Sequence, residues 1–484
     1  MLGKVFKAYD IRGTYPDPLD EKMAWQIGYG VSKFLLADAA AAGETSPMMR
    51  NIVVGRDMRR SSPGLSKSLI KGIGDHGGHV IDVGLVDTSF IYFAVNHLDC
   101  AGGVMTTASH NPPQYNGFKI SKRKAKPVGE TSGLGDIRKH AAMVDRATLQ
   151  SATGGAEERN LWEAYAHHVR AFLDLSGDKK PLKVVIDASN GMAGTMIPMI
   201  FGKKSPLGPV AGLEIIEVNF ENSKGEFVHE PNPLVTANLA MARERVLKEK
   251  ADIGFVYDGD ADRCVAIDET GTPVGCDHLT AVLAVYFLKR ASKPHVGTPG
   301  TGVVYDLRST KAVQEEIIKA GGTPIRSRVG HVFMKGVMAE KQCVFGGELS
   351  GHFYFRENFN ADSGAIAMCT VLTLLKSSGK KLSQLIAPMK RYAQSGEINF
   401  NIEDKDGAIA KLKAEFGPGA HVDELDGVTI DCFDRVGPTG GWWCNVRKSN
   451  TEPLLRLNLE ARDRKILDLM LSKISPLLGL RVDH

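Results

Sequence analysis

Three short apolar segments share a pattern in which β-branched residues run into an aspartate and then into polar or glycine-rich residues. They span residues 51–57 (Asn-Ile-Val-Val-Gly-Arg-Asp), 183–191 (Lys-Val-Val-Ile-Asp-Ala-Ser-Asn-Gly) and 252–260 (Asp-Ile-Gly-Phe-Val-Tyr-Asp-Gly-Asp). Such runs are typical of buried parallel strands whose carboxyl ends lead into polar loops. Helical patterns separate them, such as Glu21 to Leu36 and Leu65 to Ile73. The alternation predicts α/β layers, and its recurrence predicts a repeated domain.

The C-terminal part of the chain has a different pattern, which predicts a hairpin-rich α+β module with a helix from Asp463 to Leu478. The predicted strands of this module span residues 426–433, 441–447 and 454–459. A chain of 484 residues holds about three or four domains at roughly 100–200 residues each. We expect linkers near residues 151–158 and 376–381, where small and charged residues gather.

Charge and cysteine content exclude several classes of protein. A formal net charge of +4 over 484 residues is too weak to indicate a nucleic-acid or membrane partner. The seven cysteines are odd in number and show no CxxC spacing, so neither a disulfide framework nor a zinc cluster is predicted. No apolar run approaches the ~18 residues of a membrane helix, and no signal peptide is recognisable. We expect a cytoplasmic protein without an obligate protein partner.

The segment Asp258-Gly-Asp260-Ala-Asp262-Arg263 follows one of the predicted strands. Three carboxylates at alternate positions repel one another unless a cation neutralises them, and oxygen ligands favour Mg²⁺, Ca²⁺ or Mn²⁺ over zinc. An EF-hand calcium loop is one alternative, because Glu269 stands at its twelfth position. However, Arg263 replaces the required glycine, and strands rather than helices are predicted on both sides. A solvated acidic turn is the other alternative to a catalytic metal site, beside which Arg263 would pair with phosphate.

A second motif, residues 107–112 (Thr-Ala-Ser-His-Asn-Pro), follows another apolar run at 103–105. An isolated Ser-His pair is more often an ordinary turn, and adjacency alone does not make the histidine a base. No Gly-x-Ser-x-Gly elbow surrounds Ser109, which disfavours a hydrolase. Lys119, a short distance along the chain, supplies a cation that could assist a serine oxygen or a phosphate.

Three further clusters carry polar groups suited to a ligand. Residues 346–352 (Gly-Gly-Glu-Leu-Ser-Gly-His) combine a carboxylate, a hydroxyl and an imidazole, which suits a polyol. Residues 447–453 (Arg-Lys-Ser-Asn-Thr-Glu-Pro) join two predicted strands and could clamp a phosphate. His331 could act as a general acid or base, because imidazole titrates near neutrality. The alternatives are an ordinary turn, a plain hairpin connection and a structural histidine.

Taken together and in their order along the chain, these motifs resemble the α-D-phosphohexomutases, most closely the bacterial phosphomannomutase/phosphoglucomutase branch. The resemblance covers nearly the whole chain and includes residues 9–13 (Tyr-Asp-Ile-Arg-Gly). It implies three similar mixed α/β domains and a C-terminal TATA-binding-protein-like α+β domain around a central cleft. The domains it implies are 1–155 with the phosphoserine loop, 156–257 ending at the metal loop, 258–374 with the sugar loop, and 375–484 with the phosphate-binding loop.

The resemblance also implies roles for individual residues. The metal ligands that it implies for Mg²⁺ are a phosphate oxygen on Ser109 together with Asp258, Asp260 and Asp262. The catalytic residues that it implies are Ser109, His110, Lys119, Arg263 and His331. The substrate-binding residues that it implies are Tyr9, Arg12, Arg308, Glu348, Ser350, His352, Arg447, Ser449, Asn450 and Thr451. Arg308 stands where many relatives have lysine, and Leu349 stands where they often have methionine.

The resemblance therefore implies an intramolecular phosphotransferase that interconverts hexose 1-phosphate and hexose 6-phosphate, with mannose, glucose or both as the sugar. Phospho-Ser109 would give its phosphoryl group to the sugar, and the resulting hexose 1,6-bisphosphate would turn round and return the other one. Mg²⁺ and Lys119 would stabilise charge at the serine oxygen, and His331 or a nearby group would handle the proton of the sugar hydroxyl. The alternatives are a phosphoglucosamine mutase, a catalytically silent scaffold paralogue and a metal-dependent phosphatase.

Overall fold

The computed structural model describes residues 2–144, 154–176, 180–291, 300–435, 437, 440–449 and 454–482. The chain divides into two compact units. Unit 1 comprises Met1–Cys276, Met338–Glu340 and Ser350–Gln384, and unit 2 comprises Asp277–Val337, Lys341–Leu349 and Leu385–His484. Within the described ranges, no helix combines the length and the apolarity that a membrane crossing requires.

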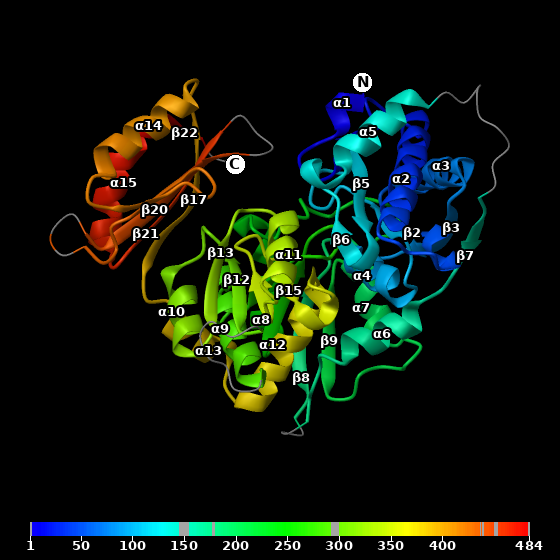
Figure 1. The fold of residues 1–484 in the computed structure, drawn as a ribbon. Helices are drawn as coiled ribbons and strands as arrows, with labels where there is room; N and C mark the ends of the chain where they lie inside the picture. Colours follow the sequence, from blue (N-terminus) through cyan, green and yellow to red (C-terminus); the bar gives the residue numbers. More distant parts are fainter. Residues whose placement is uncertain are drawn as a thin grey trace. The chain divides into compact units, whose positions relative to one another are not determined.

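The first sheet of unit 1 is mixed and is built around strand β2, which pairs in parallel with β3 and β4. Strand β5 runs antiparallel to both β4 and β1. The strands are β1 (Ile11–Thr14), β2 (Asn51–Arg56), β3 (His79–Leu85), β4 (Gly102–Thr106), β5 (Tyr115–Lys122), β6 (Lys126–Pro127) and β7 (Ala156–Glu158). The helices are α1 (Leu2–Val5), α2 (Glu21–Ala41), α3 (Ser62–His76), α4 (Thr88–His97) and α5 (Leu134–Met143). Figure 1 shows α2 beside both α3 and α5.

Helices α2 and α3 pack closely because glycines lie at their contact. A Cβ added to Gly28 would lie 2.2 Å from the carbonyl oxygen of Leu69, and one added to Gly72 would lie 2.0 Å from that of Trp25. Any larger residue would therefore push the two helices apart. Both helices were predicted from their apolar patterns and are confirmed, each somewhat longer than its pattern.

The second sheet of unit 1 has the order β11-β10-β8-β9. Strand β8 pairs in parallel with β9 and β10, and β11 runs antiparallel to β10. Its strands are β8 (Leu182–Asp187), β9 (Leu213–Val218), β10 (Ile253–Tyr257) and β11 (Cys264–Ile267), and its helices are α6 (Trp162–Arg170), α7 (Ala193–Ile200) and α8 (Ala240–Glu249). Unit 1 also contains β15 (Phe353–Phe355), β16 (Ala361–Asp362), α12 (Gly364–Ser378) and α13 (Leu382–Ile386).

A predicted domain boundary and parts of the predicted linkers coincide with strands and a helix. Strands β10 and β11 form one hairpin, so the boundary expected between residues 257 and 258 falls inside a single sheet. Of the expected linkers, Ala156–Glu158 forms β7, which pairs in parallel with β3. Helix α12 likewise continues to Ser378, into the second expected linker. Residues 151–153 of the first linker lie outside the described residues.

Unit 2 contains a parallel group of strands and a separate antiparallel sheet. Strand β12 (Gly302–Asp306) pairs in parallel with β13 (Thr323–Ser327) and β14 (Phe345–Gly347). The helices that lie wholly or mostly in unit 2 beside these strands are α9 (Cys276–Arg290), α10 (Lys311–Lys319) and α11 (His331–Glu340). The antiparallel sheet has the order β18-β19-β20-β21-β17-β22, and α14 (Lys405–Phe416) and α15 (Arg464–Leu478) cover one face of it (Figure 1). Its strands are β17 (Ala393–Asn401), β18 (His421–Asp423), β19 (Val428–Asp431), β20 (Trp442–Lys448), β21 (Leu455–Ala461) and β22 (Leu480–Val482).

The three α/β parts repeat one topology, which confirms the predicted repetition. Each part contains three successive parallel strands, of which the first is central and the second and third pair with it on its two sides: β2 with β3 and β4, β8 with β9 and β10, and β12 with β13 and β14. The loops that follow the third strands begin at Thr107, Asp258 and Glu348. The serine, aspartate and sugar motifs therefore occupy one topological position in three repeats, at the carboxyl ends of strands where α/β sheets bind ligands.

A buried carboxyl group in the C-terminal sheet predicts a pH-dependent stability. Glu460 on β21 accepts hydrogen bonds from the Lys311 backbone N–H at 2.8 Å and from Trp443 Nε1 at 2.9 Å. Burial raises the pKa of Glu460 to about 7 from an ordinary value of 4.5, so the folded state keeps a proton that the unfolded state loses. The stability from this proton is present below pH ~4.5 and is lost as the pH rises to about 7.

Between pH 4.5 and pH 7.5, the ionisation of Glu460 should lower the unfolding free energy of the wild type. In a Glu460→Gln variant this decrease should be smaller by up to about 3 kcal/mol. Urea unfolding followed by tryptophan fluorescence at several pH values measures this difference. The exposed Glu415 on α14 supplies the control, since Glu415→Gln should keep the wild-type pH profile. Identical pH profiles for the wild type and Glu460→Gln would contradict the prediction.

Candidate functional site

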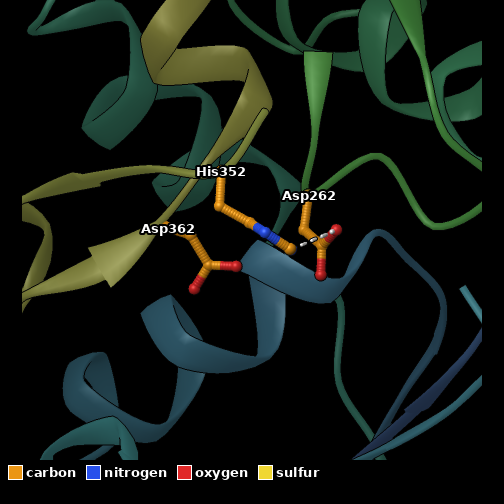
Figure 2. Close-up of side chains that lie close together, drawn as sticks. All are labelled: Asp262, His352 and Asp362. Atoms are coloured by element: carbon orange, nitrogen blue, oxygen red, sulfur yellow. Dashed lines mark ion pairs between the residues drawn. The ribbon is translucent and has the colours of Figure 1, made fainter. Parts of the chain in front are cut away.

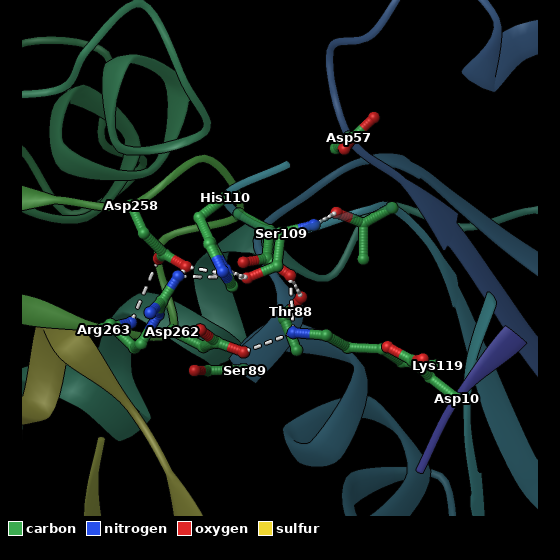
Figure 3. A network of polar contacts seen from close by, with 12 residues as sticks. Asp10, Asp57, Thr88, Ser89, Ser109, His110, Lys119, Asp258, Asp262 and Arg263 are labelled. Carbon is green, nitrogen blue, oxygen red and sulfur yellow. Dashed lines mark hydrogen bonds and ion pairs between the residues drawn. The ribbon is translucent and has the colours of Figure 1, made fainter. Parts of the chain in front are cut away.

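Ser109 follows strand β4 and is almost fully buried, with 4% of its surface exposed. Its backbone φ of 50° is left-handed, a conformation that is uncommon outside glycine. Its Oγ donates a hydrogen bond to Asp258 Oδ2 at 2.9 Å, and Arg263 Nη2 lies 3.5 Å from the same Oγ (Figure 3). The structure thus brings the predicted nucleophile into contact with the predicted metal loop.

Asp258, Asp260 and Asp262 lie in the loop between β10 and β11. Each is at most 1% exposed, and one carboxylate oxygen from each lies within 4.8 Å of the other two. The serine loop approaches this loop closely, because a Cβ added to Gly259 would lie 2.3 Å from the Ser109 carbonyl oxygen. Strands flank the aspartates on both sides, which confirms the argument against a helix–loop–helix calcium site.

The aspartate loop fits a divalent cation that prefers oxygen ligands. Three buried carboxylates supply only oxygen atoms, and Asp260 Oδ1 has no hydrogen-bond donor in the part of the chain that the structure describes. Lys119 Nζ lies 2.7 Å from Asp260 Oδ2. It also lies 2.6 Å from Asp262 Oδ2, while Arg263 Nε lies 2.9 Å from Asp258 Oδ2 (Figure 3). Lys119 was expected to assist a serine oxygen or a phosphate, and in this structure it forms ion pairs with two aspartates.

Burial and neighbouring charges set different proton affinities within this loop. Burial raises the pKa of Asp258 to about 7, although Arg263 opposes the rise. Burial alone would also raise the pKa of Asp262, but Lys119 holds it well below its ordinary value. For Lys119, burial lowers the pKa and the adjacent aspartates raise it, with a net increase. The lysine and its aspartate partners therefore remain ionised near neutral pH.

Two further predicted residues lie at the serine loop. His110 Nδ1 is 3.3 Å from Ser109 Oγ, and burial lowers the pKa of His110 well below its ordinary value. A neutral imidazole at this position can accept a proton from the hydroxyl. Arg12 on β1 donates hydrogen bonds to Asn111 Oδ1 and to the Asp10 carboxylate. Strand β1 therefore brings the first predicted motif to the serine loop.

His352 connects the predicted sugar loop with the aspartate loop inside unit 1. Its Nδ1 lies 2.9 Å from Ser350 Oγ, and its Nε2 lies 3.5 Å from Asp262 Oδ1. Figure 2 shows the imidazole between the carboxyl groups of Asp262 and Asp362, and the nearest atoms of the three side chains lie within 4.8 Å of one another. Tyr9, just before β1, is half-buried.

In unit 2, the predicted substrate-binding residues Arg308 and Arg447 gather around Glu397 of β17, together with Arg456, which was not predicted. Arg308 Nη1 and Arg447 Nη2 lie 3.2 and 3.1 Å from Glu397 Oε2, and Arg456 Nη1 lies 2.9 Å from Oε1. Burial would raise the pKa of Glu397, but these arginines lower it to about 2, so the carboxylate is ionised. Three guanidinium groups against one carboxylate leave a net positive cluster that suits a phosphate.

The predicted sugar loop has a second part in unit 2. Glu348 is 1% exposed, and its Oε1 accepts a hydrogen bond from the Gly330 N–H at 3.0 Å. This contact ties the loop to the residue before His331, which is the first residue of α11 and is half-buried. Ser449 follows β20 and is also half-buried. The predicted phosphate contacts that lie outside the described residues are Asn450 and Thr451.

Besides Arg456, sequence reasoning did not predict two residues that complete these clusters. Thr88, at the start of α4, donates a hydrogen bond from Oγ1 to Asp260 Oδ2 at 2.6 Å. Glu397 joins arginines that lie far from it along the chain. Neither residue carries a local signal, because each meets its partners only through the fold. Within unit 1, the buried serine and the aspartate loop suit metal-dependent phosphoryl transfer, which needs positioned groups and neutralised charge.

Comparison with known protein families agrees with this chemistry. The phosphoglucomutase/phosphomannomutase alpha/beta/alpha domains I, II and III match residues 3–144, 163–271 and 276–392, and the C-terminal domain of the same family matches residues 397–475. The chain therefore belongs to the phosphoglucomutase/phosphomannomutase family, as the resemblance of its motifs predicted. This match also confirms the predicted fold class, with three α/β domains and a distinct C-terminal domain.

Individual relatives extend over almost the full chain. "Phosphohexose mutases" from Xanthomonas campestris pv. campestris is 39% identical over 477 residues, covering 98% of both chains. A phosphomannomutase from Salmonella montevideo is 35% identical over 479 residues, again covering 98% of both. The solved structure of a family protein from Burkholderia thailandensis has a TM-score of 0.81 at 27% identity and covers 98% of this chain and 96% of its own. These homologues support a mutase, that is, an intramolecular phosphotransferase.

Proposed function

We propose that the protein interconverts the 1- and 6-phosphates of mannose, glucose or both through a phosphorylated Ser109. The observation that carries this proposal is the contact of a buried serine hydroxyl with a buried carboxylate of the acidic loop, with Arg263 beside both. Relatives named phosphomannomutase and phosphohexose mutases support a hexose phosphate as the substrate.

Two half-reactions with the same bond changes account for the interconversion. In the first, the bond between Ser109 Oγ and phosphorus breaks while a bond forms between phosphorus and a free hydroxyl oxygen of the sugar phosphate. The hydroxyl proton leaves to a base, and Ser109 Oγ regains a proton. In the second, the hexose 1,6-bisphosphate has turned round and these changes run in reverse. The bond between its other phosphorus and the sugar oxygen breaks while Ser109 Oγ gives up its proton and bonds to that phosphorus, and the sugar oxygen takes up a proton. We assign proton transfer at the sugar to His331 and at the serine to His110.

We propose Mg²⁺ as the cation, held by Asp258, Asp260 and Asp262 together with a phosphate oxygen on Ser109. The all-oxygen donor set supports a hard divalent ion. When bound, Mg²⁺ would neutralise negative charge on the phosphoryl oxygens. Arg263 would pair with the same phosphoryl group, and Lys119 would keep the surrounding carboxylates neutralised.

Recognition of the substrate is assigned to two kinds of side chain. Sugar hydroxyls need both donors and acceptors, which Glu348, Ser350 and His352 supply. The phosphate that is not being transferred requires positive charge, which Arg308 and Arg447 supply. The other residues proposed for substrate binding are Tyr9, Arg12, Ser449, Asn450 and Thr451.

A phosphoglucosamine mutase is the alternative substrate assignment, and a silent scaffold paralogue is the alternative without catalysis. The Glu-Leu-Ser-Gly-His sequence at residues 348–352 differs from the Glu-Gln-Ser-Gly-His of glucosamine-type mutases and disfavours the first. The intact Ser109 and complete aspartate triplet disfavour the second. The seven cysteines are all free and buried, which supports the proposal that the protein acts in the reducing cytoplasm.

One coupled assay tests the function. Mannose 1-phosphate, glucose 1-phosphate or glucosamine 1-phosphate is supplied with Mg²⁺ and a trace of the 1,6-bisphosphate, and the 6-phosphate and free phosphate are measured together. We expect 6-phosphate from mannose or glucose, little free phosphate, and a lower kcat/KM for glucosamine. Free phosphate as the main product would indicate a phosphatase, and folded protein without turnover would indicate a scaffold.

A further inference from the structure

Two of the three repeats carry the same Asp-x-Arg sequence where the central parallel strand ends. It is Asp57-Met-Arg59 after β2 and Asp306-Leu-Arg308 at the end of β12. In both, the aspartate accepts hydrogen bonds from the arginine backbone N–H and from its Nε, at 3.0 and 3.0 Å in the first case and at 2.8 and 3.1 Å in the second. The corresponding residues 187–189 are Asp-Ala-Ser, so the middle repeat lacks the arginine.

The two arginines use their remaining donors differently. Arg308 pairs with Asp306 and with Glu397 in the phosphate-binding cluster. Arg59 instead donates four hydrogen bonds from Nη1 and Nη2 to backbone carbonyl oxygens of the serine loop. The acceptors are Ser109 O at 2.8 Å, Asn111 O at 2.7 Å, Pro112 O at 2.7 Å and Tyr115 O at 3.1 Å. With Nε on Asp57, all five N–H donors of this guanidinium have acceptors.

The residues around Arg59 hold its guanidinium group and these hydrogen bonds in place. Arg59 is fully buried at 0% exposure, and its guanidinium carbon lies 4.9 Å from the centre of the Phe227 ring. Asp57 is anchored in turn by the hydroxyl of Ser62, which donates to its Oδ1. A planar guanidinium fork fixes the directions of the carbonyl groups that it binds. One of those carbonyls belongs to Ser109, so the fork also fixes the peptide plane next to the Ser109 side chain.

We propose that Arg59 is a positioning residue, which holds the backbone of residues 109–115 so that the Ser109 hydroxyl points at the aspartate loop. The inference rests on the proposed function of Ser109 as the phosphoryl carrier. Among the hydrogen bonds of the described residues, Arg59 makes none to Ser109 Oγ or to the three carboxylates of residues 258–262; it acts through the loop backbone. A misplacement of about 1 Å at a reacting group can lower a rate about 10²-fold, so loss of the fork should appear in the transfer step.

The test compares Arg59→Lys and Arg59→Met with the wild type in single-turnover phosphorylation of Ser109 by glucose 1,6-bisphosphate, followed by intact mass. Lysine keeps the charge and loses the fork, and methionine loses both. We expect transfer to Ser109 and kcat to fall about 10²-fold in both variants, with KM for the hexose 1-phosphate and the Mg²⁺ affinity within about threefold of wild type. Hydrogen exchange should increase at residues 109–115 and remain unchanged in β2 and β4.

Arg60 provides a matched control, because it is the adjacent arginine but is exposed and pairs with Glu226. Arg60→Met should transfer and turn over at the wild-type rate. Wild-type rates in Arg59→Lys would overturn the proposal. So would failure of both Arg59 variants to fold, or a general rise in exchange across unit 1, since either would show a purely structural role. If the wild-type protein is not phosphorylated at Ser109 by the bisphosphate, the proposed function itself is wrong.

Discussion

Replacing Ser109 with alanine is expected to lower turnover of hexose 1-phosphate at least about 10³-fold, because it removes the nucleophile. The sugar phosphate should still bind, since the arginines around Glu397 do not depend on Ser109. Alanine removes the hydroxyl contacts with Asp258, Arg263 and His110 but fills nearly the same space, so the fold should persist. The coupled assay measures turnover, calorimetry measures binding, and intact mass shows whether the variant still accepts a phosphoryl group.

Ser121→Ala is the matched control for this variant. Ser121 is another buried serine of the same domain, on β5, with 2% of its surface exposed. It should retain both turnover and labelling by the bisphosphate. Turnover by Ser109→Ala within about tenfold of the wild type would disprove the assignment of Ser109, whatever the effect on binding.

Replacing Asp260 with asparagine should lower kcat/KM at least about 10²-fold and move the Mg²⁺ dependence to higher concentration. Asparagine keeps the shape of the side chain and an oxygen that can accept the hydrogen bond from Thr88 Oγ1. It removes one of the three negative charges that make the loop attractive to a cation. Activity at a series of MgCl₂ concentrations measures kcat/KM and its dependence on Mg²⁺. Mn²⁺ binding followed by electron paramagnetic resonance measures the affinity for the cation without turnover.

Asp252→Asn separates the metal loop from a general effect on the strand. Asp252 lies just before the other end of β10, where its Oδ2 accepts a hydrogen bond from the Lys183 N–H at 2.9 Å. This variant should keep the wild-type Mg²⁺ dependence. An Asp260→Asn variant with unchanged Mn²⁺ affinity would show that the cation binds elsewhere.

Local patterns were sufficient to predict the framework that places the motifs. Apolar runs such as residues 51–56 and 253–257 are recognisable as buried strands, and parallel strands in α/β layers have their polar loops at one edge. That rule alone predicted that the serine and aspartate motifs lie at strand ends. It could not predict that Ser109 Oγ lies 2.9 Å from Asp258, because that distance depends on how two repeats pack.

Long-range polar contacts were beyond prediction for the same reason. Lys119 meets Asp260 and Asp262, which follow it by more than a hundred residues, and Glu397 meets its arginines across unit 2. Arg59 is different, since its Asp-x-Arg sequence recurs at Arg308 and is visible in the chain once the repeats are aligned. The recurrence of Asp-x-Arg at equivalent positions of two repeats is therefore a signal that the sequence itself contains.

The left-handed backbone at Ser109 restricts which hydroxyl amino acid can occupy this position. Threonine carries the same reactive group, but a β-branched side chain at a φ of 50° is strongly disfavoured. Glycine and asparagine tolerate this conformation, yet neither offers a hydroxyl. Of the two aliphatic alcohols in the genetic code, backbone geometry therefore admits one, and a phosphothreonine version of this chain would need a differently shaped loop.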